Sequence, residues 1–213
     1  LFLDDDSPDG TGLILDEISK SDNKVKIIHR KTSERGIGSA HMDGINYAYD
    51  KNYNYLITMD CDLSHSPEYI YDFIKLKQNY DLVIGTRFIN KESIISWNLY
   101  RKILTYLGHL ASRLFLGLKH DSTGAFRLYN LNNIDRNFVN LINFKRYSFF
   151  FESLFILNYN KYKIGEIPIN LPSRVYGQSK QTFKDVFIGV KNLFLIFLNR
   201  IFNKDKYRIK KNK

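Results

Sequence analysis

Short apolar runs alternate with longer amphipathic stretches through the first half of the chain, and this alternation constrains the fold more than any other feature. Apolar runs bounded by turn residues predict buried strands, and amphipathic stretches predict helices. The expected strands are residues 1–3, 25–29, 55–59 and 82–86, and the expected helices are residues 11–20, 39–49 and 67–78. This order predicts an α/β fold, with a mostly parallel twisted sheet and helices on both faces.

The second half of the chain has longer helical patterns. We expect helices at 97–116, 149–159 and 183–202, strands at 125–129 and 164–171, and a frayed basic tail at 204–213. Charged residues interrupt the apolar pattern of 183–202, so it falls short of the ~18 uninterrupted apolar residues that span a membrane. We expect this helix to lie in a membrane interface, with 97–116 as a second such face; ordinary packing on the sheet is the alternative. The expected division is a domain at 1–182, followed by an amphipathic helix and basic tail at 183–213.

The composition narrows the possible partners. A chain of 213 residues is long enough for one sizeable domain. Its only cysteine, Cys61, excludes an internal disulfide and a thiolate zinc cluster, and its five histidines form no H-E-x-x-H pattern. The net charge of +10 suits nucleic acid, an anionic membrane surface or phosphate substrates. No nucleic-acid-binding motif accompanies the lysines and tyrosines, so we expect no nucleic acid partner.

Two carboxylates follow the predicted strand at 55–59. Ligands of parallel sheets bind beyond the carboxyl ends of the strands. Side chains alternate along a strand, so Asp60 and Asp62 are expected to point the same way. Two hard oxygen donors suit Mg²⁺ or Mn²⁺ with positions left open for a diphosphate. The alternative is a solvated loop with two surface acids.

Two other strand ends carry charged residues. Asp4 and Asp5 follow the first strand and can accept hydrogen bonds from a nucleobase and a ribose. Arg87 follows the fourth strand and is a phosphate-ligand candidate facing Asp60 and Asp62, with a solvated surface arginine as the alternative. For Asp6, Ser7 and Asp9 we favour a connecting turn, in which Asp9 or Thr11 caps the next helix.

Three weaker signals have open alternatives. Gly36 and Gly38 either let the backbone approach a phosphate at a helix N-terminus or only shape a turn. The loop at 173–180, with Arg174 and Lys180, either holds an oxyanion or is a solvated basic loop. Glu152 lies in an aromatic run and needs a partner if buried, either a substrate hydroxyl or one of the two arginines Arg127 and Arg146.

Six motifs in order resemble one known family. They are Leu-Asp-Asp-Asp-Ser-Pro-Asp-Gly-Thr at 3–11, Asp-Cys-Asp-Leu-Ser-His at 60–65, Gly-Thr-Arg at 85–87, Ser-Thr-Gly-Ala-Phe-Arg at 122–127, Gly-Glu-Ile-Pro-Ile at 165–169 and Arg-Val-Tyr-Gly-Gln-Ser-Lys at 174–180. The series, which covers almost the whole chain, resembles the dolichol-phosphate mannosyltransferases, inverting enzymes of glycosyltransferase family 2. The resemblance implies a GT-A fold and transfer of mannose from GDP-mannose to dolichyl phosphate with Mg²⁺ or Mn²⁺.

The resemblance also implies roles for individual residues. Leu3 and Asp5 would contact the guanosine, and Asp60, Asp62 and the backbone of Cys61 would contact the diphosphate, with Asp60 and Asp62 holding the metal and carrying the catalysis. Arg87, Arg174 and Lys180 would bind donor or acceptor phosphates, and Arg101 the acceptor phosphate. The resemblance places the protein at the cytosolic face of the endoplasmic reticulum membrane, as a peripheral protein serving protein glycosylation and GPI-anchor assembly, with small membrane-anchoring subunits as candidate partners.

The chain departs from the family pattern in two places. The family opens with a strand that ends in Pro-x-Tyr-Asn-Glu, and this N-terminal strand-helix unit is absent here. The chain opens on what reads as an interior strand, so we expect further sequence upstream. Asp6 replaces a small or neutral residue and adds repulsion near the donor. Competing functions are a UDP-glucose:dolichyl-phosphate glucosyltransferase, a polyprenyl-phosphate glycosyltransferase and a non-catalytic nucleotide-sugar or membrane-binding module.

Overall fold

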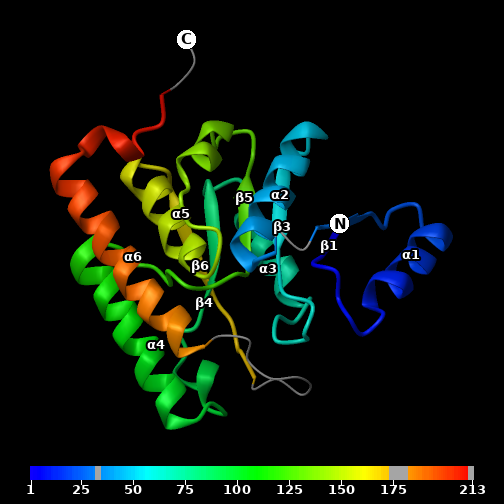
Figure 1. The fold of residues 1–213 in the computed structure, drawn as a ribbon, viewed down its shortest axis with the longest axis horizontal. Coiled ribbons are helices and arrows are strands. Elements are labelled where there is room, and N and C mark those ends of the chain that lie inside the picture. Colours follow the sequence, from blue (N-terminus) through cyan, green and yellow to red (C-terminus); the bar gives the residue numbers. More distant parts are fainter. Residues whose placement is uncertain (32–34, 173–181, 211–213) are drawn as a thin grey trace.

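The computed structural model describes residues 1–31, 35–172 and 182–210, and these form two sheets with helices around them (Figure 1). In the smaller sheet, β1 (Phe2–Asp4) pairs in parallel with β2 (Ile27–His29). The larger sheet has the order β3-β5-β4-β6 and is made of β3 (Tyr55–Thr58), β5 (Arg127–Asn130), β4 (Leu82–Thr86) and β6 (Ile164–Pro168).

Strand β5 runs against the direction of the other strands of the larger sheet. It is antiparallel to both β3 and β4, while β4 and β6 are parallel. Three of the four strands therefore point the same way, and the expected α/β class is confirmed with one reversed strand. Because Arg127 pairs with both Thr58 and Ile84, the start of β5 lies at the carboxyl ends of β3 and β4.

The helices fall close to the expected positions. They are α1 (Thr11–Ser21), α2 (Ile37–Asp50), α3 (Tyr69–Leu76), α4 (Leu99–Ala111), α5 (Ser148–Tyr159) and α6 (Phe183–Phe202). A π-helical turn (Ser112–Leu116) continues α4, and short 3-10 turns occupy Lys91–Ile94, Arg136–Leu141 and Lys204–Tyr207. A capping box between Thr182 and Asp185 starts α6, because each residue accepts a backbone N–H of the other.

Buried side chains fill both faces of the larger sheet. On β4, Leu82 and Ile84 belong to one apolar cluster and Val83 to the other, as the alternation of a strand requires. The first cluster lies under α2, α5 and α6, and the second includes Phe73 of α3 and Trp97. Helices on both faces are therefore confirmed.

The C-terminal segment packs on α5 as part of this core. Tyr207 is 1 % exposed, its carbonyl accepts from Asn160 Nδ2 at 2.7 Å, and the Ile209 N–H donates to Asn160 Oδ1 at 2.8 Å. The expectation of a frayed tail is wrong for 204–210, because a buried aromatic ring and satisfied backbone groups fix this segment. Ile196 of α6 is fully buried in the same cluster.

Candidate active site

The loop after β3 folds back on itself and holds two carboxylates at the strand end. Asp60 N–H donates to His65 Nδ1 at 2.9 Å. One oxygen of Asp62 accepts from both the backbone N–H, at 3.1 Å, and the hydroxyl of Ser64. Leu63 adopts a left-handed conformation with φ of 62°, which lets the loop turn this tightly. Asp60 and Asp62 remain partly exposed, so both are accessible to a ligand.

His65 lies beneath this loop and was not predicted from the sequence. It is 4 % exposed and packs against the Phe126 ring, with 4.9 Å between ring centroids. Burial lowers the pKa of His65, while the charges of Asp60 and Asp62 act against that shift and Arg87 adds to it. Nδ1 accepts a hydrogen bond, so the proton of the neutral ring is on Nε2. Asp60 and Asp62 follow β3 and Arg87 follows β4, and both strands pair with the start of β5, so these residues lie at the same edge of the larger sheet.

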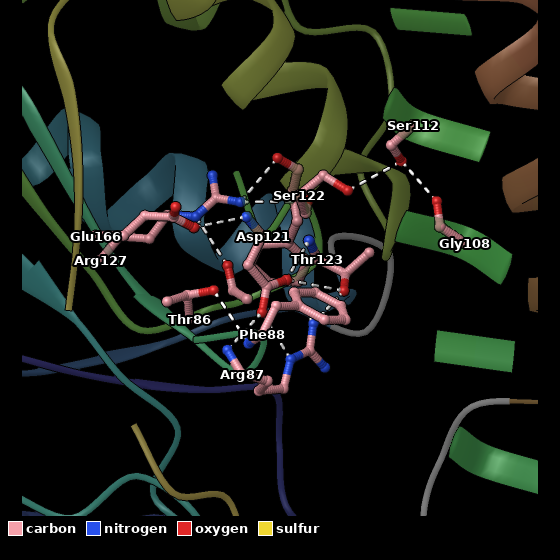
Figure 2. A network of polar contacts seen from close by, with 12 residues as sticks. Thr86, Arg87, Phe88, Gly108, Ser112, Asp121, Ser122, Thr123, Arg127 and Glu166 are labelled. Atoms are coloured by element: carbon pink, nitrogen blue, oxygen red, sulfur yellow. Dashed lines mark hydrogen bonds and ion pairs between the residues drawn. The ribbon is translucent and has the colours of Figure 1, made fainter. Parts of the chain in front are cut away.

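Arg87, at the end of β4, is buried and makes a two-pronged contact with Asp121 (Figure 2). Nε donates to one carboxylate oxygen at 2.8 Å and Nη2 to the other at 2.6 Å, and Nη2 also donates to the Thr123 hydroxyl. The interpretation of Arg87 as a solvated surface residue is therefore wrong. Its role as a phosphate ligand stays a prediction.

Asp121 is fixed from several sides. Its backbone N–H donates to Glu166 Oε1 at 2.9 Å, and Glu166 Oε2 lies 3.1 Å from His120 Nδ1. Burial opposes ionisation of Asp121, but the charge and hydrogen bonds of Arg87 lower the pKa of this carboxyl below its ordinary value. The next residue but one, Thr123, donates its N–H to Asp121 at 3.2 Å. Asp121 is therefore a buried, ionised partner of Arg87.

The Trp97 ring lies close to the guanidinium groups of both Arg87 and a second arginine, Arg101. The guanidinium of Arg101 lies 3.5 Å from the centre of the Trp97 ring, and that of Arg87 lies 5.8 Å from it. The indole N–H donates to the Leu171 carbonyl at 2.9 Å, which fixes the ring. The predicted residues Arg174 and Lys180 follow Leu171 in the chain but lie outside the described residues. Within the described part, two predicted phosphate ligands thus share one aromatic platform.

The predicted nucleoside residues surround a buried arginine. Arg30, whose side chain is 1 % exposed, pairs with Asp5 and, at 2.7 Å, with Asp43. Asp5 also accepts from Gly36 N–H at 3.0 Å. A pocket of about 320 Å³ at this end of β1 and β2 is lined by Asp4, Asp6, His29, Arg30 and Lys31. Arg30 was not predicted, because nothing local marks it as the partner of two distant acids.

Neighbouring side chains support this arrangement. The side chain of Leu3 lies against Gly44 of α2, where an added Cβ would be 3.2 Å from it. Asp6, expected to add repulsion, pairs with Arg35 at 2.6 Å. Asp9 accepts from Thr11 N–H at 3.1 Å, as expected for a connecting turn. At Gly38 an added Cβ would lie 2.6 Å from the Arg146 carbonyl, which favours the packing interpretation of that glycine.

Comparison with known proteins identifies the family. Residues 1–138 match the model of glycosyl transferase family 2. The chain is 33% identical over 183 residues to the undecaprenyl-phosphate mannosyltransferase of Micrococcus luteus, covering 85% of this chain and 75% of that protein. It is 31% identical over 189 residues to the polyprenol monophosphomannose synthase of Mycolicibacterium smegmatis, covering 87% and 71%.

The chain belongs to glycosyl transferase family 2. Its fold is the GT-A nucleotide-diphospho-sugar transferase fold. Glucosyl-3-phosphoglycerate synthase from Mycobacterium tuberculosis, solved with UDP, superposes with a TM-score of 0.54 at 15% identity, covering 94% of this chain and 68% of that one. The same protein solved with phosphoglyceric acid gives 0.53 at 15% identity, covering 93% and 67%. These likenesses show the fold alone.

In this family 2 glycosyltransferase, the loop after β3 suits a divalent cation whose coordination is completed by oxygen atoms of a substrate. No cluster of three or more metal-binding side chains occurs among the described residues. Among the described residues, Asp60 and Asp62 offer the carboxylate oxygens that follow β3. Magnesium-type ions commonly take one or two carboxylates and complete their coordination with phosphate oxygens and water. The donor set therefore suits a cation that binds together with a diphosphate.

Glu152 is a structural residue in this glycosyltransferase. Its carboxylate accepts from the backbone N–H and side-chain amide of Asn143, both at 2.9 Å, and from Phe144 N–H at 2.8 Å. The expected pairing with Arg127 or Arg146 is wrong: Arg127 donates to backbone carbonyls and Ser153, and Arg146 lies 3.5 Å from the Asp185 carboxylate. Burial raises the pKa of Glu152, against the effect of its hydrogen bonds.

Proposed function

We propose that this protein transfers mannose from GDP-mannose to a polyprenyl phosphate, dolichyl phosphate in particular, with inversion at the sugar carbon. Two relatives above 30% identity are named as mannosyltransferases of such lipids. The observation that carries the proposal is the meeting of two groups at one sheet edge. Asp60 and Asp62 follow β3, and Arg87, which shares the Trp97 ring with Arg101, follows β4; both strands pair with the start of β5.

On the donor side, Asp60 and Asp62 would hold Mg²⁺ or Mn²⁺, with the backbone of Cys61 near the diphosphate. When bound, the cation supplies positive charge to the departing diphosphate. The nucleoside would occupy the ends of β1 and β2, where Asp5 is oriented by Arg30 and Gly36, and Leu3 contributes its backbone.

On the acceptor side, the nucleophile is a phosphate monoester. Its second pKa is near 6, so it is mostly dianionic at neutral pH and needs no strong general base. The arrangement of the buried groups agrees with this. His65 Nδ1 is occupied by the Asp60 N–H, and the Asp121 carboxylate is held by Arg87. Arg87 and Arg101 would orient the acceptor phosphate.

Arg174 and Lys180 complete the proposed phosphate contacts. Each charge-assisted contact contributes about 1.5–3 kcal/mol, so Arg174→Ala and Lys180→Ala should each reduce turnover by one to two orders of magnitude. The folded fraction should be unchanged by circular dichroism. Loss of activity only in proportion to lost folded protein would make the loop structural.

The acceptor's hydrocarbon chain stays in a bilayer, so the protein must meet its phosphate at a membrane surface. Within the described ranges, no helix combines the length and apolar character needed to cross a bilayer. Helices α4 and α6 lie side by side along one flank of the fold (Figure 1). Both helices, with the turn that continues α4, carry large apolar side chains that are exposed. They are Leu99, Ile103, Leu107, Leu110 and Leu114 with Phe187, Val190, Phe194, Ile201 and Phe202.

The π-helical turn that continues α4 packs against α6. Phe115 and Phe197 meet edge to face at 5.3 Å, and Arg200 donates to the Phe115 carbonyl at 3.1 Å. Exposed cations accompany the apolar side chains, among them Lys184, Lys191 and Lys204. An apolar stripe with flanking cations suits an anionic lipid surface. We assign the protein to the cytosolic face of the endoplasmic reticulum membrane, with small anchoring subunits as candidate partners.

Vesicle flotation tests the membrane surface. The wild-type protein should float with vesicles containing anionic lipid, and less so in high salt. Phe187→Ser and Leu99→Ser should each weaken partitioning about tenfold, because each removes an apolar side chain from the interface. Leu13→Ser on α1 is the matched control, since Leu13, Leu99 and Phe187 are all 73% exposed. Equal flotation of all three variants would exclude this face.

A transfer assay tests the reaction. GDP-mannose and UDP-glucose, each labelled in the sugar, are offered with dolichyl phosphate or undecaprenyl phosphate, and label is counted in the organic phase. We expect mannose with dolichyl phosphate to give the highest rate, and no transfer after removal of divalent cations. Label from UDP-glucose would indicate the glucosyltransferase alternative. Preference for undecaprenyl phosphate would favour a bacterial-type acceptor, and nucleotide binding without transfer would indicate a non-catalytic module.

A further inference from the structure

We propose that Asp121 is a positioning residue for Arg87, so that the guanidinium presents only its third nitrogen, Nη1, to a phosphate oxygen. This inference rests on the proposed function, in which Arg87 binds phosphate. Asp121 takes Nε and Nη2 in a two-pronged contact, with Thr123 as a further acceptor for Nη2. Nη1 makes no hydrogen bond to any described residue.

The geometry favours positioning over a purely structural ion pair. Asp121 is fully buried, whereas the Arg87 side chain keeps 10% exposure, so the accessible part of the pair belongs to the arginine. That part lies at the ligand edge, near the same Trp97 ring on which Arg101 stacks. Glu166 and Thr123 fix Asp121 in turn, so the plane of the guanidinium is set by the surrounding protein (Figure 2).

The ion pair with Asp121 also gives Arg87 and Arg101 different electrostatic roles. Asp121 neutralises Arg87, so the pair offers a directed hydrogen bond with little net charge. The positive charge on the acceptor side then comes mainly from Arg101 among the described residues. Loss of Asp121 would therefore leave Arg87 charged but poorly oriented. A misplaced ligand reduces the chemical step more than binding, because orientation matters most in the transition state.

Steady-state kinetics with dolichyl phosphate tests whether Asp121 positions Arg87. Asp121→Asn places an amide N–H against an arginine N–H, and should lower kcat at least about tenfold while KM for the lipid phosphate changes less than about threefold. Thr123→Val removes one acceptor with little change in shape, and should lower kcat about threefold, in case Asp121→Asn folds poorly. Ser122→Ala is the control: Ser122 is buried beside Asp121 but its hydroxyl contacts Ser112, not Arg87.

A double-mutant cycle shows whether Asp121 acts through Arg87. Arg87→Lys keeps the charge and loses the planar fork. If Asp121 only positions Arg87, Asp121→Asn should have almost no further effect on kcat in the Arg87→Lys background. The proposal would be overturned if the two substitutions reduced kcat by independent factors that multiply in the double variant. It would also be overturned if folded Asp121→Asn kept the wild-type kcat, or if Ser122→Ala lost as much kcat as Asp121→Asn.

A binding measurement separates this inference from the proposed function. The side-chain Nε–H signal of Arg87 in ¹⁵N NMR should be protected from exchange in the wild type and lost in Asp121→Asn. Farnesyl phosphate should shift that signal in the wild type. If the wild type transfers no sugar but the signal behaves as expected, the proposed reaction fails and the positioning role stands. An unprotected Arg87 signal in the wild type would overturn the positioning role itself.

Discussion

At the end of β3, Asp60 and Asp62 are partly exposed and are shaped by residues of their own loop. At the end of β4, Arg87 is buried and is held by Asp121, which lies 34 residues further along the chain. The first arrangement can be built from six consecutive residues, whereas the second needs the whole sheet. The difference predicts that substitutions at the first end affect mainly chemistry, and substitutions at the second affect chemistry and stability together.

Asp62→Ala should have the largest effect on activity. It removes one of the two proposed cation ligands, and the rate should fall about 100- to 1,000-fold with loss of metal-dependent nucleotide binding. The free energy of unfolding should change by less than about 1.5 kcal/mol, because Asp62 is partly exposed and its contacts with Ser64 lie within its own loop. Ser64→Ala is the control, since it removes the hydroxyl contact to Asp62 and keeps both the backbone contact and the carboxylate. A near-normal rate with unchanged Mn²⁺ dependence would remove Asp62 from the site.

Arg87→Lys should have the largest effect on stability among these variants. Loss of the fork to a buried carboxylate should lower the free energy of unfolding by about 1.5–3 kcal/mol, as measured by urea denaturation. Lys75→Ala provides the comparison, because Lys75 pairs with Asp72 at 3.1 Å on the surface and should cost less than about 1 kcal/mol. Equal losses in the two variants would contradict the importance of burial at Arg87.

Asp121→Asn should change how stability depends on pH. The folded-state pKa of Asp121 is lowered from 3.8, so its stabilisation is fully present above that value and is lost as the pH falls through the lower folded pKa. The difference between wild type and variant should therefore shrink on acidification from pH 7 to pH 3. Glu152 has a raised pKa, so its own contribution should instead decline as the pH rises above 4.5. Denaturant titrations of Asp121→Asn and Glu152→Gln at several pH values check the two signs.

Ser122→Ala should have the smallest effect. Its hydroxyl donates to Ser112 in the π-helical turn at 2.9 Å, and a neutral hydrogen bond contributes about 0.5–1.5 kcal/mol. Ser21→Ala is a useful reference, because the Ser21 hydroxyl contacts a carbonyl on the exposed surface of α1. A loss above about 3 kcal/mol at Ser122 would show that the loop and α4 depend on each other more than one hydrogen bond allows.

The features predictable from sequence are those set by neighbouring residues. The strand Leu82–Thr86 and the helix Phe183–Phe202 match their expected bounds. Asp60 and Asp62 follow β3 as expected, but β3 ends at Thr58, so strand alternation does not reach them and their common direction stays a prediction. The position of Asp121 was not predictable, because it depends on the direction of β5. In a parallel strand, the turn before residue 127 would lie at the opposite edge from Arg87. The antiparallel direction brings that turn between the two ligand-bearing ends.

Other unpredicted features have the same origin in distant contacts. Arg30 is buried because Asp5 and Asp43 converge on it from different elements. Tyr207 is buried because α5 offers an apolar surface and Asn160 offers hydrogen bonds, although the surrounding sequence is basic. Local composition describes a frayed tail in that region, and only the tertiary structure identifies the aromatic residue that fixes it.

The position of β5 between β3 and β4 also sets the distance between the ends of those two strands. Neighbouring strands lie about 4.8 Å apart, so one intervening strand separates the ends of β3 and β4 by about 10 Å. In the proposed reaction, the leaving phosphate lies near β3 and the attacking phosphate near β4, on opposite sides of one sugar ring. The backbone hydrogen bonds that pair β5 with β3 and β4 therefore set the distance between the two phosphate sites. Substitutions of side chains along this edge can change which sugar or lipid is accepted, while the strand spacing keeps the distance between the two phosphate sites unchanged.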